Sequence, residues 1–169
     1  MVEQKRYLIT GGAGFIGSTL SEHLIEKGHD VLAIDNFDPY YDKMLKERNI
    51  QNLKKNSSFR LIEEDICNYE SIISQLHGNF DALIHIAAKA GVRASVENPL
   101  ECQRVNVMGT QSVLEIARVL GIKQFVFASS SSVYGINPNV PWKESDQDMM
   151  PISPYASSKL SCELLGHVY

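Results

Sequence analysis

Short runs of apolar residues alternate along this chain with segments whose apolar side chains recur every three or four positions. Apolar runs bounded by glycine, proline or polar residues predict β-strands, and the longer period predicts amphipathic helices. Five strands are predicted, at 7–10, 31–34, 59–62, 82–87 and 124–128. Helices are predicted from Ile16 until Gly28 stops the first one, around 43–55, at 69–76, and from Pro99 to a cap at Gly121. A last helix opens after Pro154.

The predicted strands are nearly apolar along their whole length, as is typical of strands buried on both faces. Their alternation with helices predicts a parallel sheet that helices cover on both sides. Because parallel crossovers are right-handed, this arrangement is a doubly wound, Rossmann-type α/β domain. Ligands of such domains gather at the carboxyl ends of the strands, so candidate site residues are sought there.

Composition narrows the class further. The chain has 169 residues, 44% of them hydrophobic and 21% charged, which fits one soluble globular domain. The net charge of −4 leaves no electrostatic footprint for nucleic acid or an anionic membrane. No apolar run approaches the roughly 20 residues of a membrane span, and no signal-peptide core precedes the first strand. Three separated cysteines, Cys67, Cys102 and Cys162, imply neither disulfides nor a metal site in a reducing cytoplasm.

A glycine-rich turn, GGAGFIG at 11–17, lies between the first predicted strand and helix. Gly11 permits a tight turn, Gly14 lets the backbone approach a pyrophosphate, and Gly17 lets helix and strand pack closely. The helix N-terminus would then face the phosphates of a dinucleotide. The glycine pattern alone is also compatible with an ordinary turn.

Asp35 ends the second predicted strand, about 20 residues beyond the turn, where a carboxylate accepts bonds from the adenosine ribose hydroxyls. A helix-cap or turn aspartate is the alternative. The same carboxylate would repel a 2′-phosphate, and no arginine follows it closely. The pattern therefore favours NAD over NADP.

Tyr155 and Lys159 are four residues apart on the helix that opens after Pro154, so both side chains project from one face. Ser130 follows a hydrophobic strand and could face them. A Tyr-x-x-x-Lys pair alone occurs by chance in many helices, but after a nucleotide-binding turn the three residues predict a hydride-transfer site. The same run offers three competing serines: Ser129, Ser131 and Ser132.

Several motifs together resemble the extended short-chain dehydrogenase/reductases. They are TGGAGFIG, DNF at 35–37, EDI at 64–66, HIAA at 85–88, SSSSVYG at 129–135 and Tyr155-x-x-x-Lys159. Within that family, DNFDPYYD and AAKAGVRASVENP are most similar to nucleotide-sugar 4-epimerases, above all the UDP-glucuronate 4-epimerases. The resemblance covers the chain end to end.

The resemblance implies further contacts to the cofactor, NAD. Asp65 and Ile66 would bracket the adenine, although Asp65 could instead cap the next helix. Asn106 would position the active-site loop, or be an ordinary helix residue. The remaining expected cofactor contacts are Phe15, Ile16, Asn36, Ala87, Ala88, Lys89, Tyr155 and Lys159. Lys159 would bond the nicotinamide ribose, whereas Lys89 could equally be a solvated loop lysine.

On the substrate side, the resemblance implies a UDP-sugar contacted by Ser130, Ser131 and Ser132. Arg93, expected in a loop after the fourth strand, could bind a phosphate or sugar carboxylate bidentately, or simply be exposed. The proline-rich segment 136–154 is expected either to gate substrate or to be a stiff connection.

The implied chemistry is transient oxidation at carbon 4 of the sugar. Tyr155 would take the proton of the 4-hydroxyl while the hydride on carbon 4 passes to NAD. Return of the hydride to the other face of the 4-keto sugar would invert the configuration at carbon 4. A free tyrosine has a pKa of about 10, so it needs a cation such as Lys159 to act as a base at neutral pH. Ser130 would hydrogen-bond the reacting oxygen.

Alternatives to UDP-glucuronate epimerisation remain open: a UDP-glucose/galactose 4-epimerase, a sugar-nucleotide dehydratase or reductase, and a non-catalytic NAD-binding module. Related 4,6-dehydratases carry acidic residues where this chain has Ser131 and Ser132, which favours epimerisation. The related enzymes also continue into a substrate-binding domain beyond the equivalent of Tyr169. We therefore expect residues 1–169 to be a truncated NAD-binding domain, inactive alone, from a protein that forms a homodimer at full length.

Overall fold

The computed structural model describes residues 3–169. The chain divides into two compact units. The first runs to Ala87 and includes Ser112–Ala128, and the second comprises Ala88–Gln111 and Ser129–Tyr169. Each unit is described by itself.

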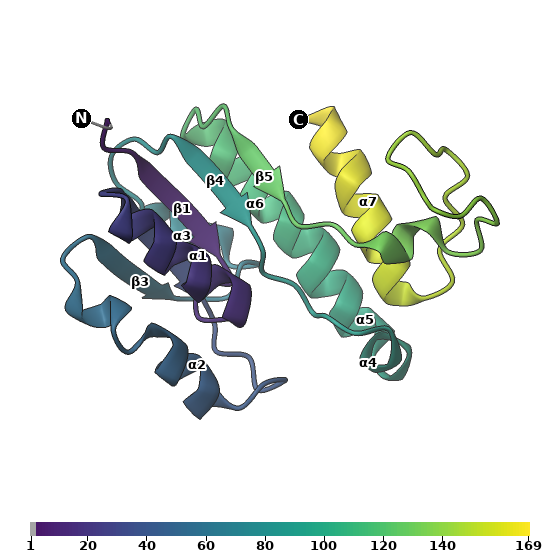
Figure 1. Ribbon diagram of the computed structural model, residues 1–169, viewed down its shortest axis with the longest axis horizontal. Helices are drawn as coiled ribbons and strands as arrows, with labels where there is room; N and C mark the ends of the chain where they lie inside the picture. Colours follow the sequence, from purple (N-terminus) through teal and green to yellow (C-terminus); the bar gives the residue numbers. More distant parts are fainter. Residues whose placement is uncertain (1–2) are drawn as a thin grey trace. The chain divides into compact units, whose positions relative to one another are not determined.

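In the described part of the chain, five parallel strands form the sheet of the first unit (Figure 1). They are β1 (Arg6–Thr10), β2 (Asp30–Asp35), β3 (Phe59–Glu63), β4 (Ala82–His85) and β5 (Phe125–Phe127). Their order is β3-β2-β1-β4-β5, and each neighbouring pair is parallel. The order reverses at β1, between β2 and β4, which is the switch point of a doubly wound Rossmann-type sheet. The predicted fold class is confirmed.

The centre of this sheet is buried on both faces. Leu8 and Ile9 of β1 pair in register with Leu32 and Ala33 of β2, and all four are at most 1% exposed. Because successive strand residues point to opposite faces, burial of neighbours means that both faces are covered. This is the physical reason why the strands have continuous apolar sequences.

Helices of the first unit surround this sheet. They are α1 (Phe15–Glu26), α2 (Lys43–Ile50), the 3-10 turn η1 (Leu53–Lys55), α3 (Tyr69–Gln75) and most of α6 (Gly109–Val119). Of the residues whose spacing predicts α1, Leu20 and Leu24 pack half-buried against the core, whereas Ile16 is 62% exposed. The fully buried side of α1 consists of small residues: Gly17, Ser18 and Ser21.

The continuous helix predicted around 43–55 was wrong. Helix α2 ends at Ile50, and the chain then tightens into η1. Asn52 and Asn56 flank that turn, with the Asn52 carbonyl accepting from Lys55 N–H and the Leu53 carbonyl from Asn56 N–H. Asparagine is a poor helix former, and this 3-10 turn brings the chain round to begin β3.

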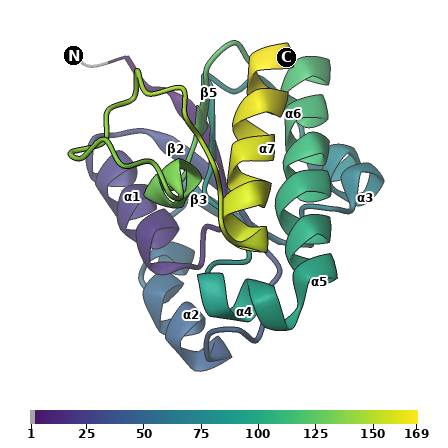
Figure 2. The ribbon, with the colours of Figure 1, turned by 90° about the vertical axis from the view of Figure 1, so that its right-hand side faces the viewer.

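The second unit is built around α7 (Pro154–Val168), the predicted last helix (Figure 2). Ser153 caps its N-terminus by accepting from Ala156 N–H, and Pro154 occupies the first turn, where its missing N–H is harmless. Four shorter elements pack on α7: α4 (Val92–Glu97), α5 (Pro99–Gln103), the π-helical turn η2 (Arg104–Met108) and the 3-10 turn η3 (Ser131–Tyr134). Within residues 3–169, no helix is both long and apolar enough to cross a bilayer.

The long helix predicted from Pro99 onward is present, but its middle departs from α geometry. It runs through α5, η2 and α6, so five residues adopt π geometry between two α-helical parts. A π turn is rare and frequently marks a functional position. No pattern in the sequence predicts it, and Asn106 lies at its centre.

The close packing at Gly17 leads to a stability prediction. A Cβ at Gly17 would collide with the backbone carbonyl oxygen of Gly11, which has little freedom to move. We expect Gly17→Ala to lower the free energy of unfolding by about 2 kcal/mol or more, measured by urea denaturation followed by circular dichroism.

Gly166→Ala is the matched control, because Gly166 is also helical and a Cβ there meets nothing within 4 Å. Alanine has the higher helix propensity, so this variant should be unchanged or more stable by up to about 1 kcal/mol. Equal effects of the two substitutions would contradict the packing argument.

Candidate functional site

The structure distributes the predicted site residues over both units. The first unit holds Gly11, Gly14, Phe15, Ile16, Gly17, Asp35, Asn36, Asp65, Ile66 and Ala87. The second holds Ala88, Lys89, Arg93, Asn106, Ser130, Ser131, Ser132, Tyr155 and Lys159.

The glycine turn sits directly on the sheet. Gly11 and Gly12 N–H groups donate to the Ile34 carbonyl at 2.8 and 3.2 Å, so the chain leaves β1 while still bonded to β2. Gly11 has φ +73°, and a Cβ on it would lie 2.8 Å from Ala87 N. Position 12 also requires glycine, because a Cβ there would collide with the Ala33 side chain. The sequence analysis did not assign this role to Gly12. Its signal was two adjacent glycines at a strand end.

Gly14 is the N-cap of α1 and is far less crowded, because its hypothetical Cβ would approach only the Gly11 carbonyl oxygen, at 3.2 Å. Phe15 and Ile16, in the first turn, are 79% and 62% exposed. A helix start presents backbone N–H groups and the positive end of the helix dipole, which together attract phosphate. The geometry therefore fits a dinucleotide pyrophosphate at this end of α1.

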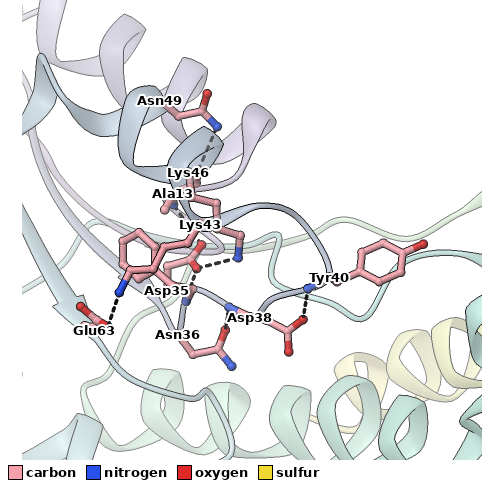
Figure 3. Close-up of polar contacts among 10 residues, drawn as sticks. Ala13, Asp35, Asn36, Asp38, Tyr40, Lys43, Lys46, Asn49 and Glu63 are labelled. Atoms are coloured by element: carbon pink, nitrogen blue, oxygen red, sulfur yellow. Dashed lines mark hydrogen bonds and ion pairs between the residues drawn. The ribbon is translucent and has the colours of Figure 1, made fainter.

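Asp35 connects this turn to β2 (Figure 3). Its buried carboxylate accepts from Ala13 N–H at 3.0 Å through Oδ2, and from Phe37 N–H at 2.9 Å and Lys46 Nζ at 3.0 Å through Oδ1. A carboxylate has about four lone-pair positions, so these three donors leave about one for a ligand hydroxyl. The turn role and the ribose role of Asp35 are thus compatible. Neighbouring Asn36 is exposed and accepts from Asp38 N–H.

Two residues of helix α2, Asn49 and Lys46, contact the glycine turn and Asp35. The sequence analysis did not identify either residue. Asn49 Nδ2 donates to the Ala13 carbonyl at 3.0 Å, and Lys46 binds Asp35. Lys46 is only 8% exposed, whereas the apolar Met44 and Leu45 of the same helix face outward. This inverts the usual amphipathic pattern, so hydrophobic spacing gave no signal for either residue.

Thr10 fixes the next loop of the first unit. Its Oγ1 accepts from Ile86 and Ala87 N–H, both at 3.2 Å, and lies 2.6 Å from His85 Nδ1. Since the hydroxyl accepts both amides, its own hydrogen is available for Nδ1. The strand predicted at 82–87 ends at His85, and the Ile86 amide also donates to the Thr10 backbone carbonyl at 3.3 Å. Ala87 is thereby held beside Gly11, where a cofactor-lining role was expected.

Asp65 and Ile66 follow β3 at the carboxyl edge of the sheet. Asp65 Oδ1 accepts from Cys67 N–H at 2.9 Å in a local turn, while the cap of α3 is Asn68 rather than Asp65. Ile66 is buried. The adjacent Glu64 has its pKa lowered by hydrogen bonds, chiefly from the Ser71 hydroxyl and then from the Asn68 amide.

Asn106 organises the second unit from the π turn. Its Oδ1 accepts from Lys89 N–H at 2.7 Å, and its Nδ2 donates to the Lys89 carbonyl at 3.2 Å and to Ser158 Oγ at 2.8 Å. One buried amide therefore holds the loop that begins at Ala88 and connects it to α7. This geometry suits the loop-positioning role expected for Asn106.

The serine run forms a tight turn rather than an open loop. Ser130 is the N-cap of η3, accepting from Ser132 N–H at 3.2 Å and donating to Ser132 Oγ at 3.0 Å. Ser129 donates to Glu163 of α7, so this competitor is engaged elsewhere. Ser131 is exposed. The turn packs on the helix that carries Tyr155 and Lys159.

Tyr155 and Lys159 lie one helical turn apart on α7. Tyr155 N–H donates to Ser95 Oγ of α4 at 3.1 Å, which anchors the helix start. Lys159 is 3% exposed, and this burial lowers its pKa below 10.5 because the charged form is disfavoured there. Arg93 was expected in a loop, but it lies exposed on α4. That six-residue helix between Gly91 and Asn98 is too short to give an apolar period.

Comparison with known proteins identifies the family. Residues 8–169 match the family model described as GDP-mannose 4,6 dehydratase, and the chain belongs to this family. The UDP-glucuronate 4-epimerase of Thermodesulfobacterium geofontis is 41% identical over 96% of this chain and 50% of its own length. The chain spans about half the length of the curated relatives that it matches.

Solved structures of nucleotide-sugar epimerases and dehydratases are similar to this chain. The UDP-glucuronic acid 4-epimerase of Bacillus cereus, a variant in complex with UDP-4-deoxy-4-fluoro-glucuronic acid and NAD, is 38% identical with a TM-score of 0.87, over 97% of this chain and 52% of that one. The dTDP-glucose 4,6-dehydratase of Streptomyces venezuelae, with NAD and TYD bound, is 30% identical with the same TM-score over 97% and 51%. Backbone similarity alone therefore does not separate epimerase from dehydratase.

The Asn106 contacts predict a local loss of protection. Asn106→Leu removes the acceptor of Lys89 N–H, so hydrogen exchange at that amide, followed by NMR, should speed up at least about tenfold. The Ala87 amide, held by Thr10 instead, should keep its rate. Unchanged exchange at Lys89 would contradict the role of Asn106.

Burial of Lys159 predicts a pH dependence of stability. Between its lowered pKa in the folded chain and 10.5, the unfolded chain binds more protons, so stability rises with pH in that window. The buried thiols of Cys102 and Cys162 have pKa values raised above 9.0 by desolvation and act in the opposite direction. The variant Lys159→Met keeps both thiols, so it serves as the reference. We expect the difference in unfolding free energy, wild type minus Lys159→Met, to rise as pH approaches 10.5. A difference that stays flat or falls would contradict the lowered pKa of Lys159.

Proposed function

We propose that this chain is the NAD-binding part of a nucleotide-sugar 4-epimerase that acts on UDP-sugars, with UDP-glucuronate and UDP-galacturonate as the preferred pair. The observation that carries the proposal is similarity to UDP-glucuronate 4-epimerases over nearly the whole chain. In this proposal the whole protein is a cytoplasmic homodimer, and residues 1–169 form its cofactor domain.

The first unit supplies a cradle that suits NAD. A side chain at Gly11 would collide with the Ala87 backbone, and one at Gly12 would collide with Ala33 of β2. The open first turn of α1 follows these two glycines. Asp35 has about one acceptor position left for a ribose hydroxyl. Asp65 and Ile66 would contact the adenine, and Asn36 and Ala87 are the remaining expected contacts of the first unit. The contacts expected from Ala88, Lys89 and Asn106 belong to the second unit.

The second unit supplies the proton chemistry. When bound, NAD provides the acceptor and donor of the hydride at carbon 4 of the sugar. Tyr155 Oη accepts the proton of the 4-hydroxyl and returns it after the 4-keto sugar has presented its other face. The Lys159 ammonium stabilises the tyrosine phenolate, and Ser130 Oγ hydrogen-bonds the reacting oxygen.

Epimerisation is favoured over 4,6-elimination by the side chains of η3. A 4,6-elimination needs additional acid and base groups near the sugar, and the residues after Ser130 are Ser131 and Ser132 rather than carboxylates. Hydroxyl groups are far weaker acids and bases at neutral pH than a tuned carboxyl. These two serines would instead contact the sugar, with Arg93 as a further candidate.

The decisive assay uses the whole natural protein that contains this chain, with UDP-glucuronate or UDP-glucose and NAD. We expect the 4-epimer to form, detected by NMR, without net accumulation of NADH at 340 nm. Tyr155→Phe should lower kcat by about 10²–10⁴-fold because it removes the proton acceptor, while NAD binding is retained.

Tyr169→Phe is the matched control, since it removes another tyrosine hydroxyl of the second unit and should keep at least half the activity. Stoichiometric NADH release would indicate a reductase, and a 4-keto-6-deoxy product would indicate a dehydratase. Binding of NAD without conversion of either sugar would favour a sensing module. Each of these results would overturn the epimerase proposal.

A further inference from the structure

Helix α2 brings a buried lysine to the residue expected to bind the adenosine ribose. Lys46 Nζ lies 3.0 Å from Asp35 Oδ1, and the two side chains are 11% and 4% exposed (Figure 3). Charges as close and as buried as these interact strongly and are weakly screened by salt. The carboxylate is thus paired with a cation before any ligand arrives.

This pairing weakens the electrostatic rejection of NADP that an aspartate at this position would otherwise give. An unpaired Asp35 would strongly reject the 2′-phosphate of NADP, and the absence of a following arginine would leave that rejection intact. With Lys46 in direct contact, the pair is close to neutral, so a 2′-phosphate near Asp35 meets much less net repulsion.

We infer that Lys46 is a specificity-determining residue of the adenosine ribose site, which sets how strongly the site discriminates NAD from NADP. The inference rests on the proposed function, because it concerns the same NAD site. The ammonium holds Asp35 Oδ1, so Oδ2 stays on Ala13 N–H. Lys46 offsets the carboxylate's charge, and the site binds both dinucleotides, NAD more tightly.

Other cations of this region have different partners. Lys43, also on α2, is exposed and lies 4.0 Å from Glu63 Oε1. Its ammonium and that of Lys54 lie over the Phe37 ring, at 5.4 and 6.0 Å from the centroid. In the described part of the chain, Lys46 is the cation that contacts the Asp35 carboxylate.

The test measures dissociation constants of NADH and NADPH by fluorescence titration, and the ratio of NADPH to NADH constants reports discrimination. In Lys46→Met the carboxylate loses its counter-charge, so this ratio should rise at least about tenfold. Lys46→Arg keeps the charge and should hold the ratio within about twofold of wild type. Asp35→Asn leaves Lys46 unopposed and should lower the ratio at least about tenfold.

Lys43→Met is the matched control, because it deletes a lysine charge from the same helix without touching Asp35, and its ratio should stay within about twofold. If Lys46→Met weakens the binding of both dinucleotides equally, Lys46 has only a structural role and the inference is wrong. Should Lys46→Met fail to fold, Asp35→Asn still decides, since an unchanged ratio there overturns the inference. If the wild type binds neither dinucleotide, the proposed function itself fails, and the inference with it.

Discussion

The first unit depends on one buried carboxylate at the end of its second strand. Asp35 accepts from Ala13 N–H, Phe37 N–H and Lys46 Nζ, and so joins β2 to the glycine turn and to α2. Burying a charge is costly unless it is paired and hydrogen-bonded, and here every donor comes from a different segment. The hydrogen bonds that compensate its burial therefore exist only while these segments keep their positions.

In the second unit, the buried side-chain amide of Asn106 joins separate segments, as the Asp35 carboxylate does in the first unit. An amide has two donor hydrogens and one acceptor oxygen, and Asn106 uses them on the backbone of Lys89 and the hydroxyl of Ser158. The π turn carries this side chain at the middle of an otherwise α-helical stretch. A local irregularity of the helix thus serves to hold a loop, which is consistent with the frequent presence of π turns at functional sites.

Lysines illustrate how burial changes the meaning of a residue type. Lys43 and Lys46 are three positions apart on one helix, yet Lys43 is exposed beside Glu63 and Lys46 is buried against Asp35. Lys159 is buried in another unit, where desolvation lowers its pKa. From sequence alone, a lysine is expected to be solvent-exposed, so only the tertiary structure distinguishes these three lysines.

The sequence by itself determined the sheet, its parallel topology and the glycine turn, because apolar runs, helical periods and glycines are local patterns that any strand or helix of this kind must carry. It also located the expected catalytic helix from Pro154 and the spacing of Tyr155 and Lys159. It missed α4, the π turn, and the contacts of Lys46, Asn49 and Thr10. Those depend on which side chains meet across distant segments, and packing, rather than local periodicity, decides where a polar group is buried and what it binds.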